Sequence, residues 1–495
     1  MSDAQAHEEL ATSTIGGLAQ SLERGEVDAK ELAARFLARI ESLDAGGPGI
    51  HAVLQVAPDW EEQAAALDRE RSEGHLRGPL HGIPILLKDN LDTRGPMGTT
   101  AGSLALAGPP APEDAPAVAR LRDAGALLLG KTNLSEFANW RSPYSVSGWS
   151  GVGGQTHNPH VLDRTPSGSS SGSGAAVAAA LAAAAIGTET DGSIVSPANA
   201  NGVCGLKPTV GAVPGLGIVP ISASQDSAGP LTRCVADLGL LGGVLAGRIE
   251  WADAGRRPDL LRGARLGVVR KGLSGRNQHT DRLFEDALRA LRDAGAVLVD
   301  PVELATADEL AELRPEPLLF AHEMKAGLAA YLARRPGLAV RTVEDVIRFN
   351  LEHADQELRW FGQEQLEKSA EAGPLDDPEY LEMRDKGRRL AGPDGIDRAL
   401  REHDLTALIA PTGSPAHAID PANSERGFGA STFPAIAGYP ILSVPMGLAL
   451  DVLPVGLSFF AGAGSEATLL ALAAGFEREA PHFHVPTYRP TLGMP

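Results

Sequence analysis

Cysteine is scarce in this chain of 495 residues, which contains only Cys204 and Cys234. Two thiols cannot cross-link a chain of this length, and their scarcity favours a compartment that keeps thiols reduced. Residues 1–20 also lack the basic stretch and the apolar stretch of a secretory signal, and they are acidic instead. The sequence therefore predicts a cytoplasmic protein.

Long apolar runs and an excess of positive charge are missing as well. The most apolar helical stretch, residues 174–186, is far shorter than the ~20 residues that cross a bilayer. Asp and Glu number 63 against 44 Lys and Arg, and the net charge of −19 opposes phosphate binding, which needs clustered basic residues. We expect neither a membrane nor a nucleic acid as a partner. Hydrophobic residues at 43% and charged residues at 22% indicate a soluble globular protein.

Helical and strand-like patterns alternate along the chain. Apolar residues at helical spacing predict two helices within 14–45, separated by a turn at 25–28, and further helices at 117–123 and 174–185. Short apolar runs next to polar or turn residues predict buried strands at 81–87, 126–130, 407–409, 441–444 and 456–459. Strands mixed with helices predict a layered α/β fold, and the lack of a clear linker predicts a single domain over residues 1–495.

Residues 308–403 differ from the rest because they are highly charged and helical in period, as in the run from 357 to 368. We expect a helical layer inserted between strands. Its carboxylates could wall the entrance of a site and favour neutral or cationic ligands, or they could form an ordinary solvated helix face. The candidates are Glu357, Glu364, Glu367, Asp376 and Asp377.

The Ser- and Gly-rich run 167–173 leads directly into an Ala-rich helical stretch. A flexible or capping loop is one interpretation, because Ser caps helices and Gly tolerates unusual backbone angles. Phosphate binding is a second, although the run has neither a Gly-Lys-Ser/Thr ending nor G-x-G-x-x-G spacing. Residues 168–172 also match the G-x-S-x-G nucleophile elbow, but residues 158–166 before them form a loop pattern where an elbow requires a strand.

A second glycine-containing turn, residues 187–194, contains Asp191, Gly192 and Ser193. Gly192 permits a tight turn in which successive N–H groups converge beside a serine, as an oxyanion hole requires. The same pattern also suits an ordinary turn before a strand. The segment is therefore a candidate for nucleophilic catalysis that still needs a base.

Candidate bases are histidines and one lysine. His157, His160 and His417 fall in loops, and no spacing singles one of them out. Lys88 ends an apolar run and could act as a neutral base if it is buried, or it could be an ordinary solvated lysine.

Metal-ligand patterns are incomplete in this sequence. The run HEMKA at 322–326 lacks the second histidine of H-E-x-x-H, and HFH at 482–484 has no carboxylate nearby. The two cysteines do not have ligand spacing. The sequence predicts neither a metal nor another cofactor.

Taken in order, these segments resemble the amidase signature family. Lys88 follows the apolar run HGIPILL, Ser169 lies within SGSSSGS, and Ser193 ends TETDGS 24 residues later. The run GVCGLKPT at 202–209 also resembles the family, and the resemblance extends over about residues 12–480. It implies an amide-hydrolysing enzyme with a large mixed, twisted β-sheet covered by helices on both faces. It also implies four parts of the domain: N-terminal helices at 1–74, a signature core with the triad at 75–245, a helical insertion at 305–403, and the C-terminal part of the sheet at 404–495.

The resemblance also implies a role for each motif residue. Ser193 would be the nucleophile that forms an acyl-enzyme, Ser169 the relay and Lys88 the base. The Gly168–Ser169 peptide bond would be cis. Backbone N–H groups of four residues would form the oxyanion hole, namely Thr190, Asp191, Gly192 and Ser193.

Asp191 stands where the broad family usually has glycine, because the common family pattern is Gly-Gly-Ser. The form found here is similar to the peptide amidase branch, as are LKDN at 87–90, WSGVGGQTHNP at 149–159 and APTGSPA at 410–416. That branch removes the terminal amide from peptide amides, so a small-molecule or peptide amide is the expected substrate. We expect the Asp191 side chain to point away from the oxyanion site.

Two other functions are left open by the sequence. An amidotransferase-type subunit that supplies ammonia to a partner resembles the same family, although that branch favours Gly-Gly-Ser and needs its partner. A catalytically silent binding protein is the other, although all three triad positions are present. We expect the protein to be a monomer or a homodimer.

Overall fold

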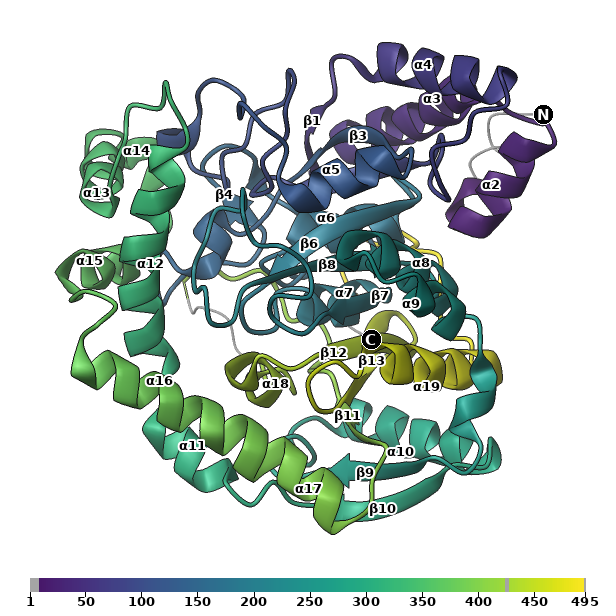
Figure 1. The fold of residues 1–495 in the computed structure, drawn as a ribbon, viewed down its shortest axis with the longest axis vertical. Coiled ribbons are helices and arrows are strands. Elements are labelled where there is room, and N and C mark those ends of the chain that lie inside the picture. Colours follow the sequence, from purple (N-terminus) through teal and green to yellow (C-terminus); the bar gives the residue numbers. More distant parts are fainter. Residues whose placement is uncertain (1–8, 423–426, 494–495) are drawn as a thin grey trace.

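The computed structural model describes residues 9–422 and 427–493. Its centre is a sheet of 11 strands with helices on both faces (Figure 1). β2 pairs in parallel with both β3 and β6, and β9 pairs in parallel with both β11 and β10. The other neighbouring strands of the sheet are antiparallel. The predicted α/β fold with a large mixed sheet is confirmed. The strand order is β1 (Val53–Val56), β3 (Leu127–Thr132), β2 (Pro84–Lys88), β6 (Ala184–Glu189), β8 (Ser227–Thr232), β7 (Cys204–Lys207), β12 (Ile441–Ala449), β13 (Leu453–Phe460), β11 (Ala407–Pro411), β9 (Arg265–Val269) and β10 (Val297–Val302).

The helices fall into an N-terminal group, a group that covers the sheet and a group built from the charged segment. The N-terminal group is α2 (Ile15–Glu23), α3 (Ala29–Arg39) and α4 (Trp60–Ser72). The second group is α5 (Pro116–Asp123), α6 (Ser171–Ala178), α7 (Val195–Asn201), α8 (Val235–Ala246), α9 (Ile249–Ala254), α10 (Gln278–Asp293), α18 (Thr432–Ala437) and α19 (Glu466–Glu479). The third is α11 (Ala307–Leu313), α12 (Glu316–Ala333), α13 (Val343–Glu352), α14 (Ala354–Glu357), α15 (Glu364–Glu371), α16 (Pro378–Ala391) and α17 (Asp397–Glu402). Figure 1 shows α12–α16 on the side of the molecule away from α2.

The N-terminal helices begin where the sequence supplies a cap. The Thr14 side chain accepts the Gly17 N–H at 3.0 Å, and the Asp28 side chain accepts the Glu31 N–H at 2.7 Å. The apolar positions at helical spacing are buried on both helices, as in Ile15. The two helices predicted within residues 14–45 are therefore confirmed, and a short π-helix, Ile40–Ala45, follows the second.

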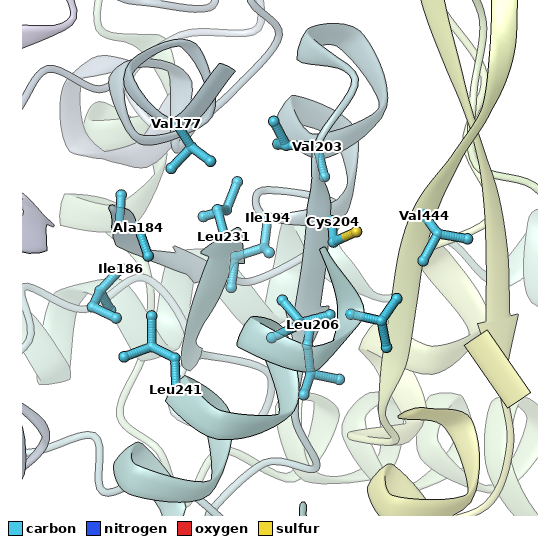
Figure 2. Packing of buried hydrophobic residues seen from close by; sticks show 14 of the residues in the cluster. Val177, Ala184, Ile186, Ile194, Val203, Cys204, Leu206, Leu231, Leu241 and Val444 are labelled. Carbon is cyan, nitrogen blue, oxygen red and sulfur yellow. The ribbon is translucent and has the colours of Figure 1, made fainter. Parts of the chain in front are cut away.

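The strand β7 shows how helices cover the two faces of the sheet. A Cβ placed at Gly205 would lie 2.9 Å from the Ala198 Cβ of α7, so this face carries α7. The next residue, Leu206, points to the other face, where a Cβ at Gly242 of α8 would lie 3.4 Å from its side chain. Figure 2 shows the buried cluster in which Leu206 and Leu241 of α8 take part. The middle of the sheet is thus held between helices on opposite sides.

The Ala-rich run at 174–185 is not one helix, so that prediction is wrong. The run contains the end of α6 and the start of β6, with Ala180 in a left-handed conformation at φ 51°. The buried Arg39 donates to the carbonyls of Ala179 and Ala180, and Arg233 donates to the Val177 carbonyl. These guanidinium groups satisfy carbonyls at the end of α6. Tertiary contacts therefore override the high helix propensity of alanine.

The charged segment forms the predicted helical layer, α11–α17. The run from 357 to 368 is interrupted between α14 and α15. The description of the whole chain as one domain stays a prediction. No helix within the described ranges is long and apolar enough to cross a membrane.

Gly229 of β8 faces the carbonyl oxygen of Leu206 on β7, and a Cβ there would overlap it. Gly229→Ala should therefore lower the free energy of unfolding by about 1–3 kcal/mol, the usual cost of overpacking. Thermal denaturation followed by circular dichroism measures the change. Gly98→Ala is the matched control, because a Cβ there meets nothing within 4 Å. Equal melting temperatures for the two variants would contradict the clash.

Candidate active site

Lys88 is the last residue of β2, and its side chain is fully buried. Its Nζ lies 2.8 Å from Ser169 Oγ, 2.9 Å from Thr188 Oγ1, and 3.1 Å from both Ser170 Oγ and the Thr188 carbonyl oxygen. An ammonium has three N–H donors for these four oxygens, whereas a neutral amine can also accept a proton from a hydroxyl. The surroundings of Lys88 therefore suit an amine that exchanges a proton with a serine.

The protonation of Lys88 is set by burial. Desolvation lowers the pKa of its amine to about 7, although the carboxylates of Asp226 and Glu189 act in the opposite direction. A lysine in water keeps its proton up to pH ~10. Lys88 is thus divided between its two forms near neutral pH, as a general base requires.

Ser169 follows a cis peptide bond, Gly168–Ser169, as the resemblance implies. Its carbonyl accepts the Ser135 N–H at 3.1 Å. A Cβ at Gly168 would overlap the hydroxyl of Ser135, so the backbone can approach this closely only without a side chain. The residues before Ser169 are not a strand, which excludes the nucleophile elbow.

The turn that carries Ser193 is joined to the Ser169 segment through the backbone. The Ser170 N–H donates to the Ser193 carbonyl at 3.1 Å. Gly192 has φ 78°, a left-handed conformation that favours glycine, and its carbonyl accepts the Ser196 N–H at 2.7 Å as α7 begins. The turn therefore leads into a helix rather than into the strand of the alternative interpretation.

Three carboxylates hold this turn. Glu189 Oε2 accepts the Ile194 and Val195 N–H groups at 2.7 and 2.9 Å. Asp226 Oδ1 accepts the Thr190 hydroxyl at 2.6 Å. The third is the carboxylate of Asp191, whose Oδ2 accepts the Thr432 hydroxyl at 3.0 Å, and burial raises its pKa. Glu189 and Asp226 are not among the site residues predicted from the sequence, although Glu189 is next to the predicted oxyanion turn.

A cavity of about 300 Å³ opens beside the two serine segments. Gly168, Asp191 and Gly192 line it, together with residues 413–417, 427–429, 431 and 432. Hydroxyl and amide side chains dominate, and among the described residues no Lys or Arg lines it. The described lining residues are Asn139, Ser147, Thr165, Ser167, Gly168, Asp191, Gly192, Ser196, Asn199, Ala200, Gly413, Ser414, Pro415, Ala416, His417, Gly427, Phe428, Gly429, Ser431 and Thr432.

The hydrogen bonds of Lys88 Nζ involve none of the candidate histidines. His157 donates from Nδ1 to the Leu162 carbonyl at 2.8 Å, and the buried His160 donates from Nε2 to the Asn201 carbonyl at 3.0 Å. His417 lines the cavity. In the described part of the chain, His, Cys, Asp and Glu side chains do not gather in groups of three or more that could hold a metal ion.

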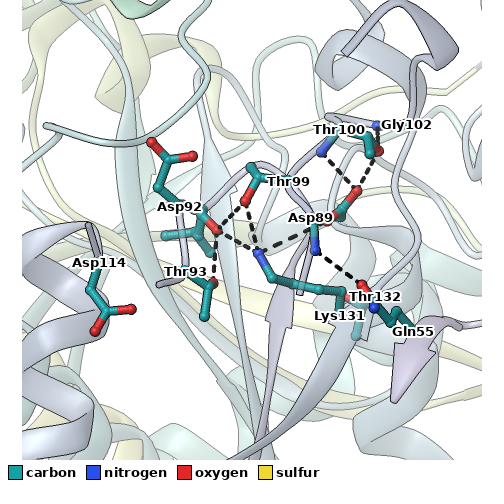
Figure 3. Close-up of polar contacts among 12 residues, drawn as sticks. Gln55, Asp89, Asp92, Thr93, Thr99, Thr100, Gly102, Asp114, Lys131 and Thr132 are labelled. Carbon is teal, nitrogen blue, oxygen red and sulfur yellow. Dashed lines mark hydrogen bonds and ion pairs between the residues drawn. The ribbon is translucent and has the colours of Figure 1, made fainter. Parts of the chain in front are cut away.

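A second buried lysine, Lys131 on the neighbouring strand β3, has a different environment (Figure 3). Its Nζ donates to the Leu91 carbonyl at 2.6 Å and to Thr99 Oγ1 at 3.2 Å, and Asp89 Oδ1 lies 3.9 Å away. These partners belong to the loop that follows Lys88. Lys131 therefore braces that loop, whereas Lys88 contacts the serines.

The predicted acidic entrance is wrong for Glu357. Its side chain is fully buried, where it contacts Arg141 Nη1 at 3.3 Å and accepts the Leu104 N–H at 2.7 Å. Arg141 also bonds Glu136 at 2.6 Å. Of the other candidates, Glu364 accepts the Ser142 hydroxyl at 2.6 Å. Asp377 caps α16, and Glu367 and Asp376 are exposed.

Comparisons with known proteins define the family of this chain. The model of the amidase family matches residues 31–470, and the chain belongs to this family. It is therefore an amide-hydrolysing enzyme.

Individual relatives are also similar over most of their length. The native peptide amidase of Stenotrophomonas maltophilia is 47% identical with a TM-score of 0.91, and the match covers 96% of this chain and 99% of that one. A probable amidase of Arabidopsis thaliana is 35% identical over 95% of this chain and 90% of that protein. A glutamyl-tRNA(Gln) amidotransferase subunit from Myxococcus xanthus is 36% identical over 96% of this chain and 99% of that protein.

Arg141 should be essential for stability, because it is buried between the carboxylates of Glu136 and Glu357. Arg141→Met should lower the free energy of unfolding by about 3–5 kcal/mol, since the two carboxylates would stay buried without their cation. Thermal or urea denaturation measures the loss. Arg348→Met is the control, because the exposed pair with Asp345 contributes little. A melting temperature of Arg141→Met equal to that of the control would contradict the role of this pair.

Proposed function

We propose that the chain is a serine amidohydrolase that converts carboxamides, including the terminal amides of peptides, into carboxylates and ammonia. The observation that carries this proposal is the fully buried Lys88 amine 2.8 Å from the Ser169 hydroxyl. A desolvated amine next to a serine hydroxyl is a base that can activate that hydroxyl at neutral pH. The 47% identity with a peptide amidase supports the substrate class.

The reaction begins with proton transfer. Neutral Lys88 accepts the proton of Ser169, and Ser169 takes the proton of Ser193 as Ser193 Oγ attacks the amide carbonyl carbon. Backbone N–H groups of residues 190–193 stabilise the negative charge on the carbonyl oxygen. Ser169 returns the proton to the leaving nitrogen, which departs as ammonia. Water then hydrolyses the acyl-Ser193 ester through the same groups.

The cavity supports a neutral, hydrogen-bonding substrate. Its hydroxyl and amide side chains can bond to the N–H and C=O groups of a peptide, and no Lys or Arg among the described lining residues would attract a carboxylate. Its volume of about 300 Å³ is at the lower end of the range for small-molecule sites. The C-terminal amide group and its adjoining residue fit this description.

An amidotransferase-type subunit is the second candidate, because the Myxococcus xanthus amidotransferase protein matches 96% of the chain. The two functions differ in their need for a partner. Release of ammonia from an N-blocked dipeptide amide by the purified chain alone would support the hydrolase and exclude an obligate partner. Absence of release over a panel of peptide, aryl and aliphatic amides would refute the proposed function.

Removal of the proposed triad residues should abolish turnover without unfolding the protein. Ser193→Ala and Lys88→Met should each lower kcat for ammonia release by about a thousandfold or more, because each removes a member of one proton-transfer chain. Lys131→Met is the matched control, a second buried lysine on the adjacent strand. It should lower the melting temperature, since Asp89 loses its nearby cation, and keep most of the turnover. Equal loss of turnover in both lysine variants would refute the assignment of the base.

Activity should rise with pH through about 7, because Lys88 acts as a base only in its neutral form and burial lowers its pKa to about 7. The midpoint belongs to the coupled triad, and it is measured from kcat/KM between pH 5 and 10. Asp226→Asn should move it to lower pH, because the Asp226 carboxylate favours the charged form of Lys88. A midpoint that stays in place or moves upward in this variant would contradict the role of Lys88.

A further inference from the structure

Lys207 is a third buried lysine on the central sheet, and the reaction described above does not use it. It is the last residue of β7, and its side chain is fully buried. Successive residues of a strand point to opposite faces, so Lys207 shares the face of Gly205, which carries α7. A Cβ at Gly205 would lie 3.0 Å from Ile194 Cγ2, the side chain that follows Ser193. Lys207 therefore extends on the side of β7 on which the Ser193 turn lies.

The charged groups that act on Lys207 are carboxylates. Those of Glu189, Asp191 and Glu466 act on its amine, Glu189 most strongly, and oppose the desolvation that lowers its pKa to about 8. Glu466 accepts the Thr209 N–H at 2.8 Å. Among the described residues, Lys207 Nζ, Glu189 Oε1 and Asp191 Oδ1 are all buried without a direct hydrogen-bond partner. Lys207 thus acts on the two carboxylates through its charge, unlike Lys131, which has direct partners.

Glu189 connects Lys207 with the Ser193 turn, because it interacts with the Lys207 charge and bonds to the backbone of the turn. Its Oε2 accepts the N–H groups of Ile194 and Val195, the two residues directly after Ser193. Burial raises the pKa of Glu189, and Lys207 is the first of the groups that oppose this rise. Hydrogen bonds to an ionised carboxylate are about twice as strong as those between neutral groups. The positive charge of Lys207 therefore favours the ionised form of Glu189, in which the two bonds to the turn are stronger.

We propose that Lys207 is a positioning residue of the amidase reaction, whose positive charge stabilises the buried Glu189 carboxylate so that its two backbone hydrogen bonds hold the Ser193 turn in place. The inference rests on the proposed function. The turn contains both the nucleophile and the oxyanion donors, whose value depends on fixed placement relative to the developing charge. Loss of Lys207 therefore acts on the chemical step and leaves substrate binding in the cavity largely unchanged.

The test is a double-mutant cycle on kcat and KM for ammonia release from an N-blocked dipeptide amide, with Lys207→Met, Glu189→Gln and the double variant. Lys207→Met should lower kcat by about tenfold or more, somewhat less than loss of an oxyanion donor, and leave KM within about twofold. In the Glu189→Gln background, Lys207→Met should change kcat by less than about twofold, because the carboxylate it serves is absent. Leu206→Met is the control on the same strand, since its side chain points to the other face, and it should keep the wild-type kcat.

Two results would overturn the inference, namely a wild-type kcat in Lys207→Met or the same fold loss in both backgrounds. If Lys207→Met does not fold, the double variant is compared with Glu189→Gln alone. The double variant lacks both the Lys207 cation and the Glu189 carboxylate, so it leaves neither of these charges buried without the other. Equal kcat values then support the inference, and a further loss refutes it. The variant Ser193→Ala distinguishes failure of the proposed function from failure of the positioning role. Wild-type ammonia release by Ser193→Ala refutes the serine mechanism, whereas an inactive Ser193→Ala with an unchanged Lys207→Met refutes only the positioning role.

Discussion

The burial of the Lys88 amine is the constraint on which the arrangement of the site depends. An amine taken out of water must be surrounded by oxygen atoms, and those around Lys88 come from two other segments, the serine run and the end of β6. The parallel strands β2 and β6 bring their ends to the same edge of the sheet. Without this pairing, the lysine would have neither a dry environment nor its hydroxyl partners.

The convergence of these segments also explains the small residues around them. A Cβ at Gly187 of β6 would lie 2.6 Å from Ser170 Oγ, one of the contacts of Lys88. The Ser170 side chain therefore lies too close to the β6 backbone for any side chain at Gly187. The glycines and serines of this region, which look like a flexible linker in the sequence, are instead buried parts of a packed site.

The net charge of −19 gives little indication of how charge is used inside the protein. Three buried lysines, Lys88, Lys131 and Lys207, end or nearly end strands of the sheet, and each has carboxylates near it. Lys131 makes direct bonds, Lys88 contacts hydroxyls, and Lys207 acts without a direct partner. Desolvation lowers the pKa of all three, and their partners decide what each can do.

Local patterns predicted the features that depend on local sequence. The apolar run before Lys88 indicated a strand, and the capped N-terminal helices followed from their periodicity. The order of the motifs indicated that Lys88 and Ser169 belong to one site. The structure places the two side chains in contact, and their catalytic roles stay a prediction. Strands such as β8, with the sequence SAGPLT, gave no apolar signal, because their burial comes from neighbours on both sides.

Long-range contacts account for the errors. The end of the helix within the Ala-rich run depends on hydrogen bonds from Arg39 and Arg233, which are far away in the sequence. These contacts cannot be inferred before the fold is known. Glu357 has the same sequence context as a solvated helix face, and only its contact with Arg141, 216 residues away, shows that it is buried. Glu189 and Lys207 belong to the same category, since their relation depends on how β6 and β7 are placed in the sheet.

The position of β12 has a consequence for how the protein is made. β7, which carries Lys207, pairs with β8 on one side and with β12 on the other, and β12 begins only at Ile441. Residues 413–417, 427–429, 431 and 432, which line the cavity, also come late in the chain. During synthesis, Lys88, Ser169 and Ser193 leave the ribosome more than two hundred residues before these parts. The growing chain therefore carries these three residues before the segments that enclose them, and the site is complete only after residues 413–449 have been added.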